Sequence, residues 1–327
     1  MADRPAFTFR AAQVFVAIVE AKSVTGAAKR LGMGASSVSQ QLANLEAALE
    51  ARLIERNARM FRLTSAGEVF LRRALAILDD VSAAKAELAL ADQAPPIALR
   101  VAMIEEFDSS VTPHWLGALA RKFPNISFSI SSGASHENHD ALANRAADLI
   151  LAVDVGDPAE WVESHDILRD AFVLVTPQDA DGAMDRAALS ERPFMRYASD
   201  LSIGRQVEGA LRRASLRPPH RYDFTNNRAL FAMVAESGGW GVSTALAILG
   251  TTEAQHSIRA RRLPFPGFSR RLALHARRGA YGDLPRLMAA QLRCSIAHTL
   301  LPRLDSVPGL LPDDLAIIDA EIPERSF

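Results

Sequence analysis

The stretch that most constrains this chain is residues 23–46, with the sequence SVTGAAKRLGMGASSVSQQLANLE. The pattern predicts two short helices joined by a tight turn. Residues 25–31 form the first helix, and Ser23 is placed to cap it because its hydroxyl can accept a free backbone N–H. Gly32 and Gly34 flank the break, and glycine tolerates backbone conformations that other residues avoid.

The second helix begins near Ala35 and has two distinct faces. Val38, Leu42, Leu45 and Leu49 recur at helical spacing and predict one buried stripe. The other face carries short, uncharged side chains that suit contact with base edges and phosphates. These side chains are Ser36, Ser37, Ser39, Gln40, Gln41 and Asn44. A helix-turn-helix uses its second helix in this way, although two amphipathic helices of an all-α core would share the pattern.

The next segment is typical of a wing. Residues 53–56 and 61–64 predict two very short strands on either side of a hairpin tip. Arg56, Arg59 and Arg62 are placed to meet phosphates or a minor groove. A solvated basic hairpin is the alternative interpretation.

Charge is distributed unevenly along the chain. Residues 1–62 hold nine lysines and arginines against five acids, a net charge of +4, whereas the whole chain carries −1 and the remainder therefore −5. A basic head on an acidic body fits a small DNA-binding module. Cys294 is the single cysteine, which fits a reducing cytoplasm, and no apolar run reaches the roughly 20 residues of a membrane helix. We therefore expect a cytoplasmic protein without a membrane span.

A long helix follows the wing and continues to about residue 91. Ser65 and Glu68 have the spacing of a capping box, with Thr64 as a rival cap. Its apolar residues step by four and three, which is a heptad seam and predicts a dimeric coiled coil. The seam consists of Phe70, Ala74, Ile77, Val81, Ala84 and Leu88. Packing against the chain's own second domain is the alternative.

Residues 9–91 resemble the N-terminal half of a LysR-type transcriptional regulator. The resemblance rests on short runs that match in order and spacing. These runs are residues 15–17 (FVA), 23–31 (SVTGAAKRL), 38–42 (VSQQL), 45–46 (LE), 53–56 (LIER) and 62–68 (RLTSAGE). It implies a winged helix-turn-helix that binds double-stranded DNA as a homodimer, with a homotetramer built from two dimers. The residues that we expect to contact DNA are Arg10, Ser23, Thr25, Ser36, Ser37, Ser39, Gln40, Arg56, Arg59, Arg62 and Thr64.

The start of the second helix departs from the family pattern. The family usually has Ser-Gln-Pro where this chain has Gly34-Ala35-Ser36, and it often has Arg where this chain has Gln40. Glutamine pairs with adenine, whereas arginine favours guanine. We therefore expect an operator that differs from those of typical members, and a nonspecific affinity that depends more on Arg10 and the wing arginines.

The second half predicts an α/β fold of two lobes with a cleft between them. Strands are expected at 97–103, 126–130, 149–153, 171–176, 194–197 and 222–224, and helices at 113–123, 140–147, 202–214 and 229–237. The resemblance extends here to about residue 304, through FPNI (123–126), ADLIL (147–151), FVLV (172–175) and VAESGGWG (234–241). It implies an effector-binding domain similar to periplasmic binding proteins.

These observations divide the chain into four expected segments. They are a winged helix-turn-helix (1–64), a linker and dimerisation helix (65–94), an effector-binding domain (95–304, second lobe about 170–265) and a C-terminal extension (305–327). Proline punctuates the acidic extension, which is expected to hold a short helix near 314–320 or to form a loose tail.

In open α/β lobes, ligands bind at the carboxyl ends of the strands. This rule selects three loops, which follow the strands predicted at 97–103, 126–130 and 194–197. The effector-binding residues predicted from these loops are Glu105, Glu106, Asp108, Ser131, Ser132, Gly133, Tyr197, Ser199 and Ser202. The family often has Ser or Thr at Glu105 and Glu106 and uses it to bind carboxylates, which the acids here would repel. Our hypothesis is therefore an effector with an amine or other cationic group, or a metal. The alternative is a solvated acidic loop beside an arginine such as Arg196.

Other functional classes find little support. His136, Glu137 and His139 resemble a metal cluster but open a helix, where polar residues are ordinary. Ser243 lies in a weak imitation of a nucleophile elbow without His and Asp partners in order. We predict no cofactor, no metal and no enzymatic activity. The predicted function is a LysR-type regulator with a small-molecule effector; an effector-independent repressor with a vestigial cleft, and an enzyme regulated by the head, are the alternatives.

Overall fold

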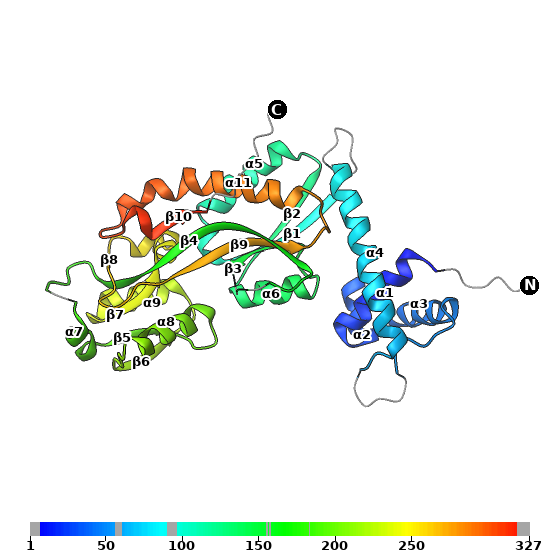
Figure 1. Cartoon of the computed structure of the whole chain (residues 1–327), viewed down its shortest axis with the longest axis horizontal. Coiled ribbons are helices and arrows are strands. Elements are labelled where there is room, and N and C mark those ends of the chain that lie inside the picture. The colour runs from blue at the N-terminus through cyan, green and yellow to red at the C-terminus, as the bar shows by residue number, and fades with distance from the viewer. Residues whose placement is uncertain are drawn as a thin grey trace, which may run out of the picture. The chain divides into compact units, whose positions relative to one another are not determined.

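The computed structural model describes residues 7–55, 61–89, 97–154, 156, 158–182 and 184–318 (Figure 1). Internal contacts divide the chain into two compact units. The first is Met1–Ala86 with Gly279–Gly282, and the second is Glu87–Arg278 with Asp283–Phe327. Each unit is described by itself below.

The first unit is mainly helical. Its helices are α1 (Phe9–Ala21), α2 (Val24–Leu31), α3 (Ala35–Ala48) and α4 (Ser65–Ala89) up to Ala86. The predicted cap of α2 is confirmed, because the Ser23 hydroxyl accepts the Gly26 N–H at 3.0 Å. Gly32 then ends α2 in the left-handed conformation, with φ of 64°. The two predicted helices and the turn between them are therefore present.

The buried stripe of α3 fixes this helix against α1 and α2. Val38 and Leu45 are almost fully buried, and Leu42 packs beside them. Glu46 is also buried, and its carboxylate accepts the backbone N–H groups of Leu53 and Ile54 at 2.8 and 3.4 Å. This buried carboxylate joins α3 to the root of the wing.

The described part of the wing contains a single antiparallel bridge, between Ile54 and Leu63, where two short strands are predicted. Residues 56–60 lie outside the described part of the chain. The helix that follows is capped by Thr64 and not by Ser65, because the Thr64 hydroxyl accepts the Gly67 N–H at 3.0 Å and donates to the Arg52 carbonyl at 2.6 Å. Thr64 is the better cap because its single hydroxyl hydrogen-bonds both the first turn of α4 and the backbone just before the wing.

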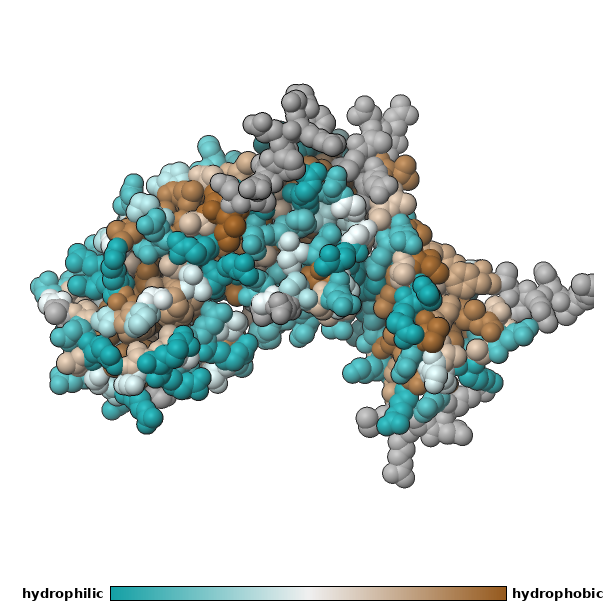
Figure 2. Space-filling view, viewed as in Figure 1, coloured by the Kyte–Doolittle hydropathy of each residue, from teal (hydrophilic) through white to brown (hydrophobic). Residues whose placement is uncertain are grey.

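The predicted heptad seam of α4 is only partly available to a partner. Phe70 packs edge-on against Phe15, with their ring centroids 5.2 Å apart. Ala74 is fully buried in this unit's own core. By contrast, Ile77 and Leu88 are 37% and 55% exposed, and Figure 2 shows hydrophobic residues at the surface around α4. The first two seam positions were therefore wrongly assigned to a dimer interface, because α1 already covers them.

The second unit is built on a sheet that both lobes share (Figure 1). The strands follow the order β2-β1-β3-β9-β4-β7-β5-β6, and β8 and β10 pair with β4. Their bounds are β1 Ile97–Met103, β2 Ile126–Ser132, β3 Leu149–Val153, β4 Val162–Pro177, β5 Phe194–Tyr197, β6 His220–Phe224, β7 Trp240–Thr244, β8 Ile258–Arg261, β9 Ser269–Arg277 and β10 Leu315–Ile317. The strand predicted at 171–176 is thus the end of the long β4, which passes from lobe one to lobe two beside β9.

Helices cover both faces of this sheet. In Figure 1, α5 and α11 lie on one side of the lobe-one strands and α6 on the other. The bounds are α5 Val111–Lys122, α6 Ser135–Ala143, α7 Arg186–Glu191, α8 Ser202–Arg213, α9 Asn227–Ser237, α10 Ala245–Gly250 and α11 Leu284–Thr299, with 3₁₀ turns at Glu105–Phe107, Thr252–Ala254, Leu301–Ser306 and Pro312–Asp314. The predicted α/β fold of two lobes is confirmed. In the described part of the chain, no single helix is long and apolar enough to cross a membrane.

The predicted helix near 314–320 is wrong. A 3₁₀ turn at Pro312–Asp314 leads into β10, which pairs antiparallel with Leu168–Asp170 of β4. Leu315 is 1% exposed, so the free edge of β4 offers both backbone partners and burial for an apolar side chain. Residues 319–327 lie outside the described part of the chain.

Gly67 provides a test of the first unit. A Cβ at this position would lie 2.1 Å from the Leu53 carbonyl oxygen, because α4 crosses the wing root there. Alanine in a helix is normally about 1 kcal/mol better than glycine, yet we expect Gly67→Ala to lower both the unfolding temperature and DNA affinity. Gly117→Ala, at an open helical position, is the control for thermal unfolding. An unchanged melting curve for Gly67→Ala would contradict the packing described.

His275 provides a pH test of the second unit. Its Nδ1 lies 2.7 Å from the Ser164 hydroxyl, and its buried Nε2 has no hydrogen-bond partner among the described residues. Burial, and to a lesser extent the nearby His139, lowers the pKa of His275 to about 4. The folded state therefore binds this proton less readily than the unfolded chain.

The free energy of unfolding therefore depends on pH through His275. The stability that comes from holding His275 neutral is fully present above its ordinary pKa of 6.5, and it is lost as the pH falls toward about 4. The loss amounts to as much as about 3 kcal/mol. We expect urea unfolding of His275→Gln to depend less on pH over this range, whereas the exposed-site control His136→Gln should behave as the parent protein does. Equal pH dependence in all three proteins would refute the assignment.

Candidate functional site

The exposed face of α3 is the first candidate site. Ser36, Ser37, Ser39 and Gln40 all lie on the solvent side, as predicted from the sequence. The Gln40 side-chain amide donates to Asn44 Oδ1 at 2.9 Å, one turn further along the helix. This face is uncharged, so its chemistry matches base edges and phosphates rather than an acidic partner.

The other predicted DNA contacts surround this face or belong to the domain's own hydrogen bonds. Arg10 is exposed and donates to Gln13 Oε1 at 3.3 Å, and Thr25 and Arg62 are also exposed. Ser23 and Thr64 use their hydroxyls as helix caps. Arg56 and Arg59 lie outside the described residues.

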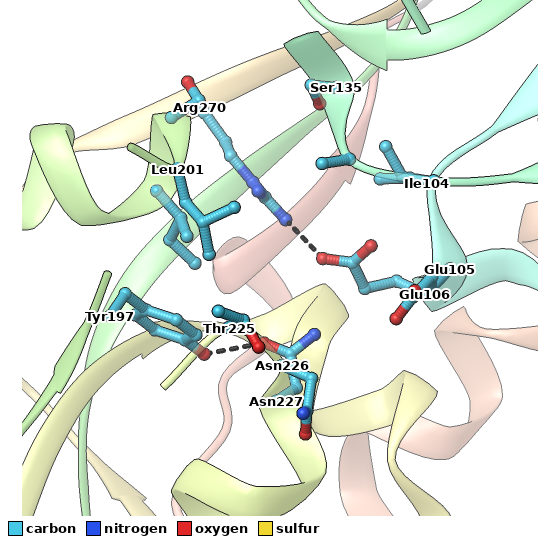
Figure 3. Close-up of a pocket in the computed structure, with 14 residues that line it drawn as sticks. Ile104, Glu105, Glu106, Ser135, Tyr197, Leu201, Thr225, Asn226, Asn227 and Arg270 are labelled. Atoms are coloured by element: carbon cyan, nitrogen blue, oxygen red, sulfur yellow. Dashed lines mark hydrogen bonds and ion pairs between the residues drawn. The ribbon is translucent and has the colours of Figure 1, made fainter. Parts of the chain in front are cut away.

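The second candidate site is a pocket between the two lobes (Figure 3). Its interior volume is about 90 Å³, which is below the usual range of small-molecule sites, so this arrangement of the lobes admits only a small ligand. Lobe one contributes the loop after β1 and the start of α6, and lobe two contributes the ends of β5 and β6. The described lining is Ile104, Glu105, Glu106, Gly133, Ala134, Ser135, Tyr197, Leu201, Ser202, Ile203, Thr225, Asn226, Asn227 and Arg270.

A buried ion-pair network forms the floor of this pocket. Arg270 Nε donates to Asp170 Oδ2 at 2.8 Å, and Arg270 Nη2 donates to Glu106 Oε1 at 3.3 Å. The second Asp170 oxygen accepts the Leu246 backbone N–H at 2.9 Å. Arg270 also reaches the Thr244 hydroxyl at 3.2 Å. The network thus joins lobe one, through Glu106, to the crossing strands and to lobe two.

The charge state of Arg270 follows from its partners. Burial alone would lower the pKa of Arg270, but the carboxylates of Asp170 and Glu106 outweigh it and raise the pKa. The guanidinium therefore stays charged and satisfies Glu106. The arginine proposed from the sequence, Arg196, is not this partner, because it pairs with Asp223 at 2.6 Å instead.

A second buried network supports the lobe-two wall. The Tyr197 hydroxyl donates to Asn227 Oδ1 at 2.6 Å and lies 2.8 Å from the Ser243 hydroxyl. Burial raises the pKa of Tyr197, so the phenol stays neutral. Tyr197 therefore offers its ring to the pocket, while its hydroxyl holds Asn227 in place, and Ser243 serves this support rather than acting as an exposed nucleophile.

Glu105 is in a different situation from Glu106. Its carboxylate has no hydrogen bond or ion pair with any described residue, although it lines the pocket. Partial burial raises the pKa of Glu105. The carboxylates of Glu106, Asp108 and Glu137 raise it further, in that order. The pocket thus contains a carboxylate whose environment favours loss of its charge or the arrival of a cation.

The structure brings together most of the predicted effector residues. Glu105, Glu106, Gly133, Tyr197 and Ser202 line the pocket. Asp108 and Ser132 line an adjoining hollow and share a 2.6 Å hydrogen bond. Ser131 and Ser199 line neither. Ser131 precedes Ser132 on β2, and successive side chains of a strand point to opposite faces.

Sequence reasoning missed two parts of the site. Thr225, Asn226 and Asn227 follow β6, so the strand-end rule would have found them had it been applied to that strand. Arg270 lies on an antiparallel strand that returns from lobe two, and no motif in the sequence marks it. Its role depends on a pairing with Asp170 across 100 residues.

The His-rich start of α6 is a structural feature. Glu137 accepts the Ala134 N–H at 2.9 Å, and His139 Nε2 lies 3.0 Å from the Val153 carbonyl. Across the described ranges, no group of three or more His, Cys, Asp or Glu side chains is arranged to hold a metal ion.

Both units match known protein families. Residues 9–68 match the bacterial regulatory helix-turn-helix family of lysR type, and residues 93–293 match the LysR substrate binding domain. This chain belongs to the LysR family. It is a LysR-type transcriptional regulator with a DNA-binding helix-turn-helix and an effector-binding domain, and the family is not one of enzymes.

Individual relatives agree with this assignment. The chain is 26% identical over 274 residues to the nitrogen assimilation regulatory protein nac of Escherichia coli, covering 82% of this chain and 88% of that protein. It is 33% identical over 172 residues to a probable hydrogen peroxide-inducible genes activator of Mycobacterium xenopi, covering 52% and 89%. A solved full-length OxyR variant from Pseudomonas aeruginosa shares the fold, with a TM-score of 0.64, 21% identity and coverage of 88% and 95%.

The buried network of this LysR regulator provides a test. Arg270→Gln leaves Asp170 charged and buried without its cation, which costs about 3–5 kcal/mol. We expect a much smaller effect for Glu106→Gln, because the Asp170–Arg270 pair remains. Urea unfolding of the full-length protein measures both, and a Glu106→Gln variant as unstable as Arg270→Gln would contradict this ranking.

Proposed function

We propose that this regulator responds to a small molecule with an amine or other cationic group, bound between the lobes. The observation that carries the proposal is the Glu105 carboxylate, which lines the pocket without a cationic partner among the described residues. The pocket's own cation, Arg270, is already held by Asp170 and Glu106. A cationic group beside Glu105 would relieve the repulsion among these acids.

The rest of the lining supports a polar ligand of modest size. Asn226, Asn227 and Ser202 can donate to or accept from its other groups, and the Tyr197 ring and Leu201 provide apolar surface. Because these groups come from both lobes, a ligand that contacts both would favour one arrangement of the lobes over another.

We further propose that the regulator binds its operator as a homodimer, with a homotetramer of two dimers as the family-based extension. One α3 helix would then enter each major-groove half-site, about 34 Å or a multiple of it apart. The exposed Ile77 and Leu88 of α4 supply the apolar surface for dimerisation. The residues proposed to meet DNA are those of the exposed α3 face, with Arg10, Thr25 and Arg62 beside it.

An effector-independent repressor is the second candidate. The observation that favours it is the Arg270–Glu106 contact, in which the protein's own side chains already join the two sides of the cleft. Footprints of the operator with and without amines would separate the two functions.

Glu105 provides the test of the effector proposal. The raised pKa means that the folded state holds the Glu105 proton more tightly than the unfolded chain does. Ionised Glu105 therefore destabilises the folded state, and this loss of stability develops as the pH rises from the ordinary pKa of 4.5 through the raised pKa. We expect Glu105→Gln to melt at a higher temperature at pH 7, with the advantage lost below pH 4.5.

The same variant separates classes of ligand. In a thermal-shift screen, amines should stabilise the parent protein and leave Glu105→Gln unchanged, and Glu236→Gln, on α9, is the charge-matched control. Stabilisation by carboxylates that lack an amine, retained in Glu105→Gln, would overturn the cationic-effector proposal.

The α3 face has its own test. Gln40→Ala should change sequence preference at one base position per half-site, because a glutamine–adenine pair contributes about 1–3 kcal/mol of discrimination. Arg62→Ala should instead weaken binding to all sequences and reduce the salt slope by about 1. Binding-site selection and salt titrations measure these effects. An unchanged preference in Gln40→Ala would show that another residue reads the operator.

A further inference from the structure

A second groove lies on lobe two, away from the interlobe pocket. Its walls are the middle of β4, the segment between β8 and β9, and the turn at Pro312–Asp314 of the C-terminal extension. Arg169 and Asp170 are consecutive on β4, so their side chains point to opposite faces of the strand. Asp170 pairs with Arg270, which lines the interlobe pocket, whereas Arg169 lines the groove. The two sites therefore lie on opposite sides of the crossing strands.

Three arginines line this groove, and none of them has a carboxylate partner among the described residues. Arg169 Nη2 donates to the Asp313 backbone carbonyl at 2.7 Å, and Arg261 Nε donates to the Thr176 hydroxyl at 3.3 Å. Both acceptors are neutral. Arg262 is exposed and makes no hydrogen bond or ion pair with a described residue. The positive charge of these side chains is thus not neutralised locally, although two of them are half-buried.

The acids at the rim do not cancel this charge. Asp313 is exposed, and its backbone rather than its carboxylate meets Arg169. Asp314 Oδ2 accepts the Leu311 N–H at 2.9 Å within its own turn. Among the described lining residues, three cations against two acids leave the groove positive, so charge complementarity favours an anionic ligand.

An aromatic pair forms the apolar part of the groove. The rings of Phe172 and Phe268 are stacked, with centroids 4.2 Å apart and an angle of 16°. Phe268 is half-buried and lines the groove, so part of its surface is open. A flat ligand can extend this stack, because aromatic rings favour offset-stacked and edge-to-face contacts.

The extension that supplies one wall is firmly attached. The Ala260 N–H donates to the Pro308 carbonyl at 3.0 Å, and Gly309, with φ of 88°, approaches so closely that a Cβ would lie 2.0 Å from the Ala260 oxygen. Leu315 is buried beside β4. The groove is therefore a preformed surface in which Arg169 is held in place, which reduces the entropy lost on binding.

We propose that this groove binds a small planar carboxylate, such as an aromatic acid. The guanidinium of Arg262 pairs with the carboxylate in the fork geometry that arginine favours. Arg169 adds long-range attraction, and the ring of the ligand lies against Phe268. This second site goes beyond the proposed function, because it takes a ligand of the opposite charge on the other side of the crossing strands.

Isothermal titration calorimetry of the full-length protein with benzoate tests the proposal, and benzyl alcohol is the neutral analogue. We expect benzoate to bind and benzyl alcohol to bind at least about tenfold more weakly, since the charged pair is lost. Arg262→Gln should weaken benzoate by a similar factor. Arg262 is exposed, so this variant is expected to fold.

Two variants locate the site. Arg212→Gln removes another exposed arginine, on α8, and should leave benzoate affinity unchanged. Glu105→Gln alters the interlobe pocket and should also leave it unchanged, so failure here is distinguishable from failure of the amine proposal. The proposal is overturned if the parent protein does not bind benzoate, if Arg262→Gln binds it equally well, or if Glu105→Gln changes the affinity while Arg262→Gln does not.

Discussion

The effector-binding domain depends on one buried pair, Asp170 with Arg270. A carboxylate and a guanidinium with almost no exposure are each unfavourable alone, so each fixes the position of the other. The pair lies where β4 and β9 cross between the lobes, and its remaining hydrogen-bonding groups reach Glu106, Thr244 and the backbone of α10. The pocket is therefore built around charges that cannot easily be rearranged. This rigidity is what leaves Glu105, beside the network but outside it, as the carboxylate available to a ligand.

The two candidate sites, the exposed face of α3 and the interlobe pocket, use polar groups in different ways. On α3 the side chains that face solvent are small and uncharged, and their positions follow from a buried stripe and two helix caps. In the pocket the groups that form the floor and the lobe-two wall, Arg270 and Tyr197, are buried, and their positions follow from pairings across the sheet. A DNA-reading surface of this kind can change residue by residue without disturbing the core. The pocket cannot, because Arg270 supports Glu106, and Tyr197 and Asn227 support each other.

Much of this organisation could be predicted from the sequence. Local patterns were sufficient for α2, α3, the wing position and the alternation of strands and helices, because short-range periodicity determines them. The errors have a common origin in long-range pairing. Phe70 and Ala74 fit a heptad seam but are covered by α1, and the segment near Leu315 becomes a strand because β4 has a free edge. No local pattern marks Arg270, because its partner Asp170 is distant in the sequence, and Arg196, the example given for a partner of the acidic loop, pairs with Asp223 instead.

Glu46 has a consequence for how operators can vary. Its carboxylate holds the backbone at the start of the wing, so the recognition helix and the wing root form one body. The angular offset between α3 and the wing root, the two parts proposed to meet DNA, is then a constant of the protein. Half-sites whose grooves are out of phase with that offset must be accommodated by twisting or bending of the DNA. The stiffness of the base steps between the two contacts thus becomes part of operator selection, even where no side chain touches those bases.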